Sequence, residues 1–329
     1  MISLFSRSSK EVDDITKSAK KHRLELLSAL SGVLIAGQSR INGELSTEMG
    51  DSLEAALVSF VSGLIFVSLI SFIRKDVRAG FKNILRAVAN KSLSQWRLGA
   101  GVLGASFVVM QTYVVPIVGV VLFSVASLAG QTVVSLWVDH VGLIGNRKTV
   151  VTIRRLVVAF VTVLSVIISA WDRFSLNNFS PMAIILAVIA GGWVGVQRAL
   201  NGQINSYSNT SFATSQLNFI TGTMFLLLLL ILRSLFSDHS IMNLSTGPWW
   251  MFLGGSIGVI YIAISAVAVQ HLGVLDFTLF SVGGMLFGSL VIDVFAPTTG
   301  TFISWYLLAG ILISYLGVIA NGQTRLSRR

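Results

Sequence analysis

Two short segments of the chain carry the same pair of carboxamide side chains at the same spacing. Gln38 is followed four residues later by Asn42, and Gln197 is followed four residues later by Asn201. Residues four apart on a helix share one face, so each pair would present its amides together. Carboxamides donate and accept hydrogen bonds without a charge, which suits the lining of a path for a polar solute. Hydrogen bonding between helices, or capping of a helix end by Asn-Gly, is the alternative.

An arginine lies beside each carboxamide pair. Arg40 belongs to the sequence Gln-Ser-Arg and Arg198 to Gln-Arg, so the two arginines differ by one position within the repeated motif. A cation at membrane depth is costly and usually faces a cavity or a partner. Each arginine could attract an anionic substrate or pair with a carboxylate in a gate. The alternative is that each guanidinium reaches the membrane surface on its apolar stem.

Three aspartates are candidates for gating or proton coupling. Asp139 and Asp293 occupy equivalent places near helix ends in the two halves of the chain, where an acid opposes the helix dipole and needs a compensating partner. A structural salt bridge is the alternative for both. Asp276 has no acidic equivalent, because Leu122 stands in the matching place. The remaining groups expected at mid-membrane, which could line a cavity or simply pack, are Gln131, Tyr113, Tyr261 and Trp193.

The chain contains one pattern of small and polar residues twice. Gly32 and the segment 59–63 (Ser-Phe-Val-Ser-Gly) return 159 residues later as Gly191 and the segment 218–222 (Asn-Phe-Ile-Thr-Gly). Farther along the chain, the two copies are 154 residues apart, and there Gly101, Gly104 and Gly130 match Gly255, Gly258 and Gly284. Each copy lies in mostly apolar sequence, which indicates a duplicated membrane unit, a common plan for transporters.

The composition favours a membrane protein. Of 329 residues, 53% are hydrophobic and 12% are charged, whereas soluble domains carry about 25% charged residues. Cysteine is absent, which excludes disulfides and zinc–thiolate sites, and we expect neither a cofactor nor a metal ion. The net charge of +10 lies in a few short loops, which favours contact with anionic membrane lipid over binding of nucleic acid.

We expect an all-α integral membrane fold with ten transmembrane helices. A helix needs about 20 apolar residues to cross the hydrocarbon. The ten stretches of suitable length are 24–42, 55–73, 98–116, 118–138, 152–171, 182–201, 212–232, 249–269, 274–295 and 302–320. Their continuous apolar pattern favours helices over a β-barrel. Residues 1–23 and 321–329 would form cytosolic tails.

Lysine and arginine predict the orientation of these helices. With the N-terminus in the cytoplasm, the inner segments carry 21 Lys and Arg and the outer segments carry 3. Both termini are therefore expected on the cytoplasmic side of the bacterial inner membrane. Residues 24–171 and 172–320 would each form a five-helix repeat. Because five is odd, the second repeat would enter the membrane upside down, giving two inverted repeats.

The basic loop 74–97 is expected to hold a helix on the cytosolic lipid surface, with a solvated linker as the alternative. Its apolar face would comprise Phe81, Ile84, Leu85 and Val88, and its basic stripe Arg78, Lys82 and Arg86. This separation of apolar and basic residues is typical of interfacial helices.

Small residues four apart predict close contacts between helices in lipid. Such pairs are Gly101 with Ala105, Ala126 with Gly130, Gly254 with Gly258, and Gly284 with Gly288. They predict a compact bundle built around the third, fourth, eighth and ninth expected helices.

Two segments match motifs of soluble enzymes. Residues 99–104 match a dinucleotide fingerprint and 254–258 a nucleophile elbow, but neither follows a predicted strand. An intramembrane hydrolase that uses Ser256, with His271 or a residue of another helix as base, is therefore a minor alternative. No Gly-x-x-x-x-Gly-Lys-Ser/Thr segment occurs in the sequence, which disfavours an ATP-driven pump.

These residues resemble the drug/metabolite transporter superfamily, in its YdcZ-like branch. The resemblance is carried by 38–45 (Gln-Ser-Arg-Ile-Asn-Gly-Glu-Leu), 56–60, 129–131 and 139–142, and it extends over nearly all of 24–320. Family members are single five-helix units or fused ten-helix pairs, and this chain resembles a fused pair. In the second half, Met285 stands at the position equivalent to Gln131, and Val294 stands at the position equivalent to His140.

The resemblance implies secondary transport of small molecules, often outward and often proton-linked. The mid-helix glutamate of related small multidrug exporters is absent, since Ile35, Ala36 and Gly37 occupy that region. We therefore expect a secondary active transporter that moves a small polar solute by alternating access, as an exporter and not as an enzyme. The expected partners are that solute, membrane lipid and, as an open option, a second copy of the chain. A non-transporting scaffold or lipid-handling partner is the alternative function.

Overall fold

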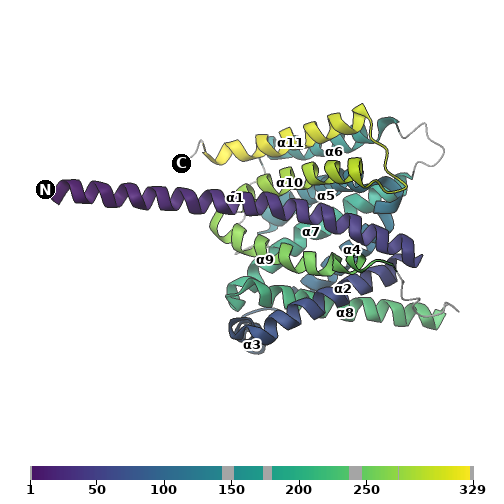
Figure 1. The fold of residues 1–329 in the computed structure, drawn as a ribbon, viewed down its shortest axis with the longest axis horizontal. Coiled ribbons are helices and arrows are strands. Elements are labelled where there is room, and N and C mark those ends of the chain that lie inside the picture. The colour runs from purple at the N-terminus through teal and green to yellow at the C-terminus, as the bar shows by residue number, and fades with distance from the viewer. Residues whose placement is uncertain (1, 143–151, 173–179, 237–246, 273, 327–329) are drawn as a thin grey trace.

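The computed structural model describes residues 2–142, 152–172, 180–236, 247–272 and 274–326, and within these ranges the chain is helical without β-strands (Figure 1). The helices of the first half are α1 (Ile2–Met49), α2 (Ser52–Ile73), α3 (Lys75–Ala89), α4 (Ala100–Val118), α5 (Val120–Val141) and α6 (Ile153–Ser169). Those of the second half are α7 (Pro181–Ser208), α8 (Ser211–Phe236), α9 (Gly254–Leu272), α10 (Val274–Phe295) and α11 (Trp305–Leu326). Short 3-10 helices, Gln95–Gly99 and Trp249–Leu253, precede α4 and α9.

The ten apolar stretches correspond in order to the helices α1, α2 and α4 to α11, and α3 lies in the basic loop between the second and third stretches. Among the described residues, five segments are long and apolar enough to cross a membrane, namely Ser52–Ile73, Gln95–Val118, Val120–Val138, Pro181–Ser208 and Ser211–Phe236. Shorter apolar helices cover Arg155–Ser169, Trp249–Ser265, Phe280–Phe295 and Trp305–Gly317. The all-α membrane fold is thus confirmed.

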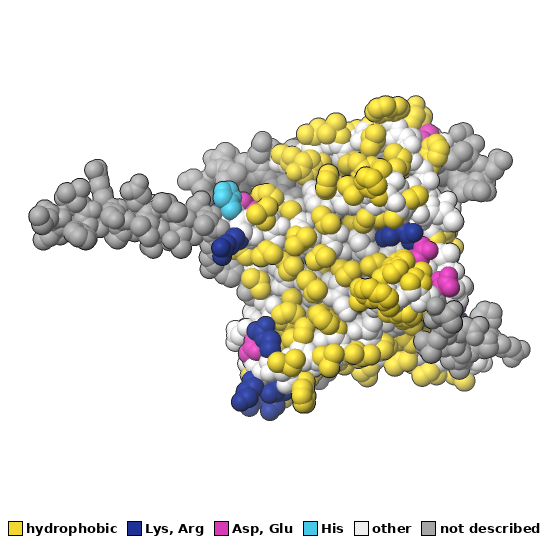
Figure 2. Space-filling model, in the orientation of Figure 1, with side chains coloured by type: hydrophobic (Ala, Val, Ile, Leu, Met, Phe, Trp, Pro, Cys, Tyr) yellow, Lys and Arg dark blue, Asp and Glu magenta, His cyan; other side chains and the backbone are white. Residues whose placement is uncertain are grey.

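Helix α1 is 48 residues long and takes in the polar residues expected to form a tail. Its N-terminal part extends well beyond the bundle, and both termini and α3 lie at the same end of the molecule (Figure 1). Hydrophobic side chains cover the middle of the face in Figure 2, while Lys, Arg, Asp and Glu gather toward the two ends of the helices. This banded distribution fits a bundle that spans lipid.

The two halves interlock through equivalent helices. Helix α1 packs against α10 and α9, and α7 packs against α5 and α4. Helix α2 packs against α8, its own equivalent, and α6 packs against α11. Exchanging the two halves leaves this pattern of contacts unchanged.

Glycines permit the closest approaches between helices. A Cβ on Gly130 would overlap the backbone of α7 at Val188, and a Cβ on Gly284 would overlap that of α1 at Ala29. The sequence predicts a compact bundle built around the glycine-bearing helices α4, α5, α9 and α10, and in the structure their glycines face helices of the opposite half. Lipid gives no preference to neighbours in sequence, so packing is closest wherever two backbones lack side chains.

Helix α3 packs partly against protein rather than lying wholly on lipid. Val77 and Ile84 are fully buried in a cluster that includes residues of α7 and α8, whereas Leu85 remains half exposed. Before this helix, the Arg74 guanidinium donates to the Asp76 carboxylate at 3.1 Å and lowers the pKa of that carboxyl. Both groups lie at the surface, so the pair adds little stability.

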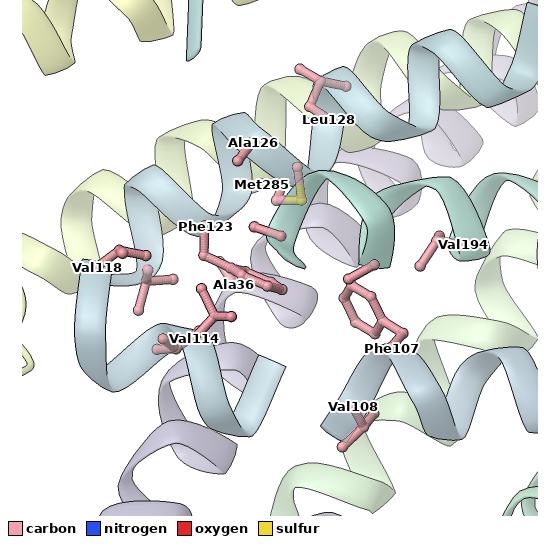
Figure 3. Packing of buried hydrophobic residues seen from close by; sticks show 14 of the residues in the cluster. Ala36, Phe107, Val108, Val114, Val118, Phe123, Ala126, Leu128, Val194 and Met285 are labelled. Atoms are coloured by element: carbon pink, nitrogen blue, oxygen red, sulfur yellow. The ribbon is translucent and has the colours of Figure 1, made fainter. Parts of the chain in front are cut away.

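The main hydrophobic core lies between the halves. In Figure 3, Ala36, Phe107, Phe123, Val194 and Met285 come together from five different helices. The rings of Phe107 and Phe123 lie 5.8 Å apart between centroids, at 48° to each other. This core forms part of the wall of the cavity described next.

Candidate functional site

A cavity with about 760 Å³ of space between atoms, part of it open to solvent, lies where the two halves meet. Its wall comes from α1, α2, α4 and α5 of the first half and from α7, α8, α9 and α10 of the second. The polar and charged residues that line it are Gln38, Ser39, Ser124, Ser127, Gln131, Gln197, Arg198, Asn218, Tyr261 and Ser281.

The two carboxamides of the repeated motif, Gln38 and Gln197, face this cavity together. The amide of Gln197 donates to Asn218 Oδ1 at 3.1 Å. The side chain of Gln38 is 5% exposed and has no hydrogen-bond partner among the residues that the structure describes. A Cβ on Gly104 would overlap the Gln197 amide, and a Cβ on Gly258 would lie 2.9 Å from Gln38 Nε2. Glycine in α4 and α9 therefore makes room for each glutamine.

Arg198 is the one charged residue among the described residues that line the cavity. Its Nε and Nη2 donate to Tyr261 Oη at 3.1 and 2.6 Å. The guanidinium also lies 5.9 Å from the centroid of the Phe277 ring, within range of a cation–π interaction. Helix α7 continues to Ser208, beyond the end at 201 that the sequence predicts, which places Arg198 well inside the helix rather than near its end.

Gln131 lines the cavity, and so does Met285, the apolar residue at the equivalent position of the second half. The Nε2 of Gln131 donates to Ser127 Oγ at 3.2 Å, while its Oε1 is buried without a partner among the described residues. A buried acceptor without a donor costs about 1–3 kcal/mol. The amide is therefore poised to receive a donor from a molecule in the cavity.

The two motif asparagines lie behind the cavity wall. Asn42 donates to Gln111 Oε1 at 2.8 Å, and Gln111 donates to Ser39 Oγ at 2.7 Å. In the second half, Asn218 donates to Asn201 Oδ1 at 2.7 Å. Asn42 and Asn201 are therefore hydrogen-bonded within the protein, as the alternative interpretation of the motif expects.

Arg40 and Tyr113 are not among the residues that line the cavity. Arg40 forms an ion pair with Glu44 and donates to the carbonyl of Ala296 at 2.8 Å. Tyr113 is 47% exposed. The partner of Arg40 thus lies one turn farther along the same helix.

Asp293 caps a helix of the other half. Its carboxylate accepts from the backbone N–H groups of Val120 and Val121 at 3.1 and 2.8 Å, at the first turn of α5. It also accepts from the Thr301 hydroxyl at 3.3 Å. The dipole of α5 thus supplies the compensation that an acid near the end of α10 requires. Asp139 and Asp276 lie in α5 and α10, but their side chains are outside the described part of the chain.

The sequence did not single out several residues of the site. Asn218, Gln111 and Phe107 join the cavity or its supporting network but carry no charge or recognisable motif. Asn218 had a signal, since it opens the repeated segment 218–222. Gln111 and Phe107 had none, because their role depends on which helices of the two halves meet.

One family model matches the chain twice, over residues 24–168 and 182–320. The model is described as "Putative inner membrane exporter, YdcZ". The chain belongs to the YdcZ family. The double match confirms the resemblance to a fused YdcZ-like pair and places the protein in the inner membrane. A search of curated proteins finds no match.

Proposed function

We propose that this YdcZ-family protein is a secondary active exporter that moves a small polar solute by alternating access, with the cavity as its binding site. The observation that carries this proposal is the cavity wall, to which each half contributes four helices. A site at the interface of two repeats can open to either side of the membrane when the halves exchange conformations. The family description as an exporter supports the outward direction.

The contacts between helices support two inverted repeats of five crossings. Every contact of α1 with the second half has a counterpart made by α7 with the first half. An odd number of crossings per repeat requires the second to be inverted. The termini and α3 lie at one end of the bundle (Figure 1), and 21 of the 24 Lys and Arg belong to segments assigned to that end. We assign this end to the cytoplasm.

Transport is tested in proteoliposomes loaded with a mixture of polar metabolites, by following their release with mass spectrometry. At least one solute is expected to leave with saturable kinetics. Gln38→Leu and Gln197→Leu should each abolish this flux in protein that still folds, because the leucines remove carboxamides from the cavity. Gln95→Leu is the matched control, since Gln95 is exposed and does not line the cavity. Flux that is absent for every solute, or unaffected by both cavity variants, would favour a non-transporting scaffold.

The topology is tested with introduced cysteines, which is straightforward because the natural chain has none. Glu48, Ser94 and Thr152 are all exposed. A membrane-impermeant maleimide applied to intact spheroplasts should label Glu48→Cys, but should label Ser94→Cys and Thr152→Cys only after permeabilisation. Labelling of Ser94→Cys and Thr152→Cys from opposite sides would refute the inverted arrangement.

A further inference from the structure

Among the residues that the structure describes, no acidic side chain in the cavity wall balances the charge of Arg198. Arg198 is a cation, and the described lining contains no aspartate or glutamate. The hydrogen bonds of Arg198 go to the neutral phenol of Tyr261, and no carboxylate lies within ion-pair distance in the part of the chain that the structure describes. Partly buried charges normally have a counter-charge, because a low-dielectric surrounding penalises an isolated ion. An anion in the cavity would supply the counter-charge that the described residues do not provide.

The guanidinium also has hydrogen-bonding capacity to spare. Arginine carries five N–H donors, and the contacts of Arg198 with Tyr261 involve only Nε and Nη2. The phenol holds one edge of the guanidinium, while the ring of Phe277 lies 5.9 Å from its carbon atom. The remaining donors suit a planar carboxylate, which arginine binds through two parallel hydrogen bonds.

This charge is a feature of one half only. The position equivalent to Arg198 in the first half is Ser39, and the position equivalent to Tyr261 is Phe107. Both residues of the first half also line the cavity. The pseudo-symmetric cavity thus has a cationic side formed by α7 and α9 and an uncharged side formed by α1 and α4. One cation suits a solute with one negative charge rather than a symmetrical dianion.

The rest of the wall indicates what the anion carries with it. Phe60, Phe107, Phe123 and Phe219 line the cavity, and Phe60 and Phe219 lie 5.0 Å apart between ring centroids. These rings provide apolar contact area for the body of a ligand. The buried Oε1 of Gln131 awaits a hydrogen-bond donor.

We propose that the solute is a small organic monoanion, with a carboxylate that binds Arg198 and an apolar or aromatic body that packs on the phenylalanines. The proposal builds on the cavity assigned above as the transport site. Tyr261 is a positioning residue, because it orients the guanidinium without contributing a charge. A polar group on the solute would donate to Gln131.

The proposal is tested by thermal unfolding of the purified full-length protein in detergent at constant ionic strength. The probes are phenylacetate, its uncharged analogue phenylacetamide and the cation phenethylamine, each up to about 10 mM, which detects dissociation constants of about 1 mM. Phenylacetate should raise the melting temperature in a saturable way, and the other two should not. Hexanoate, an anion with an apolar but non-aromatic body, should also stabilise the protein.

Variants separate the charge of Arg198 from its structural contacts. Arg198→Gln should weaken phenylacetate binding about 10- to 100-fold, the effect of losing hydrogen bonds to a charged group. Arg198→Lys should retain part of the affinity, and Tyr261→Phe should weaken binding while keeping the preference for anions. Arg86→Gln removes an exposed cation from α3 and should change nothing. A merely structural Arg198 would lower the melting temperature of the free protein without altering the order of the three probes.

The outcomes distinguish this proposal from the proposed function. Equal stabilisation by phenylacetate and phenylacetamide, unchanged binding in Arg198→Gln, or no response to either anion would overturn the assignment of an anionic solute. Saturable flux of a neutral or cationic solute with no anion binding would leave the transporter standing and refute the substrate class. Binding of phenylacetate that depends on Arg198, without any flux, would support an anionic ligand and refute the transport function.

Discussion

Replacement of Asp293 tests whether this aspartate anchors a helix or couples protons. Its carboxylate accepts hydrogen bonds from the backbone of Val120 and Val121, and the residue is 3% exposed. Asp293→Ala leaves both N–H groups without that acceptor, and each unsatisfied buried donor costs about 1–3 kcal/mol. We expect a loss of about 2–4 kcal/mol of unfolding free energy.

Asp293→Asn should cost less. Asparagine caps helices about as well as aspartate, but its one side-chain oxygen can accept from only one of the two N–H groups that the two carboxylate oxygens bind. The variant loses one hydrogen bond and also the attraction of a negative charge to the helix N-terminus, about 0.3–1 kcal/mol at surface sites and up to about 2 kcal/mol when partly buried. A structural anchor therefore predicts the order wild type, Asn variant, Ala variant.

The measurement is unfolding in mixed micelles with increasing denaturing detergent, followed by tryptophan fluorescence. Asp76→Ala is the control, since it removes a carboxylate that is exposed and paired only at the surface. An Ala variant as stable as wild type, or an Asn variant as unstable as the Ala variant, would refute the capping argument. An Asn variant of normal stability whose flux no longer depends on pH would instead support proton coupling through Asp293.

Three further predictions concern small residues of the bundle. Gly130→Ala should destabilise the protein by about 1–3 kcal/mol in the same unfolding assay, because the new Cβ meets the backbone of α7 at Val188 and forces two helices apart; stability equal to wild type would contradict the close packing. Gly104→Ala should instead lower flux at nearly unchanged stability, because its Cβ meets only the flexible end of Gln197. Ser256→Ala should retain activity in the proteoliposome assay, whereas its complete loss would favour an intramembrane hydrolase.

The helices could be predicted from the sequence to a large extent because lipid imposes a simple rule. Backbone polar groups in hydrocarbon must be paired within the segment, so long apolar stretches become helices. The ends were harder to place, since a helix continues wherever its polar residues find water or partners. Helix α7 runs to Ser208 rather than 201, and α1 takes in residues expected to form a tail.

The site was only partly predictable, and the difference lies in packing between the halves. Gln38, Gln197, Gln131, Arg198 and Tyr261, all proposed from the sequence, meet in one cavity. Spacing along a helix predicts which residues share a face, but it does not predict which face of another helix they meet. The same ambiguity explains why the asparagines of the same motif lie in hydrogen-bonded networks behind the wall.

Alternating access requires parts of the bundle to move as rigid bodies, and the helix contacts suggest which parts. Helices α1, α9 and α10 all contact one another, as do their equivalents α7, α4 and α5. Glycines bring the backbones together inside each group, where Gly284 meets Ala29 and Gly130 meets Val188. Close-packed backbones resist sliding, so the conformational change should occur between the two groups rather than within them.

Cysteine pairs distinguish these two kinds of contact. Ser31 and Ser281 lie within one group, with their Oγ atoms 3.4 Å apart. Asn42 of α1 and Gln111 of α4 belong to different groups and are hydrogen-bonded at 2.8 Å. Oxidative cross-linking of a cysteine pair at 31 and 281 should leave flux nearly intact, because this contact persists in both states. A cross-linked pair at 42 and 111 should lose flux and regain it on reduction, with the reduced protein as its own control. Equal sensitivity of both pairs would mean that the groups of helices do not move as rigid units, and the cavity would then need another route to alternate between the two sides of the membrane.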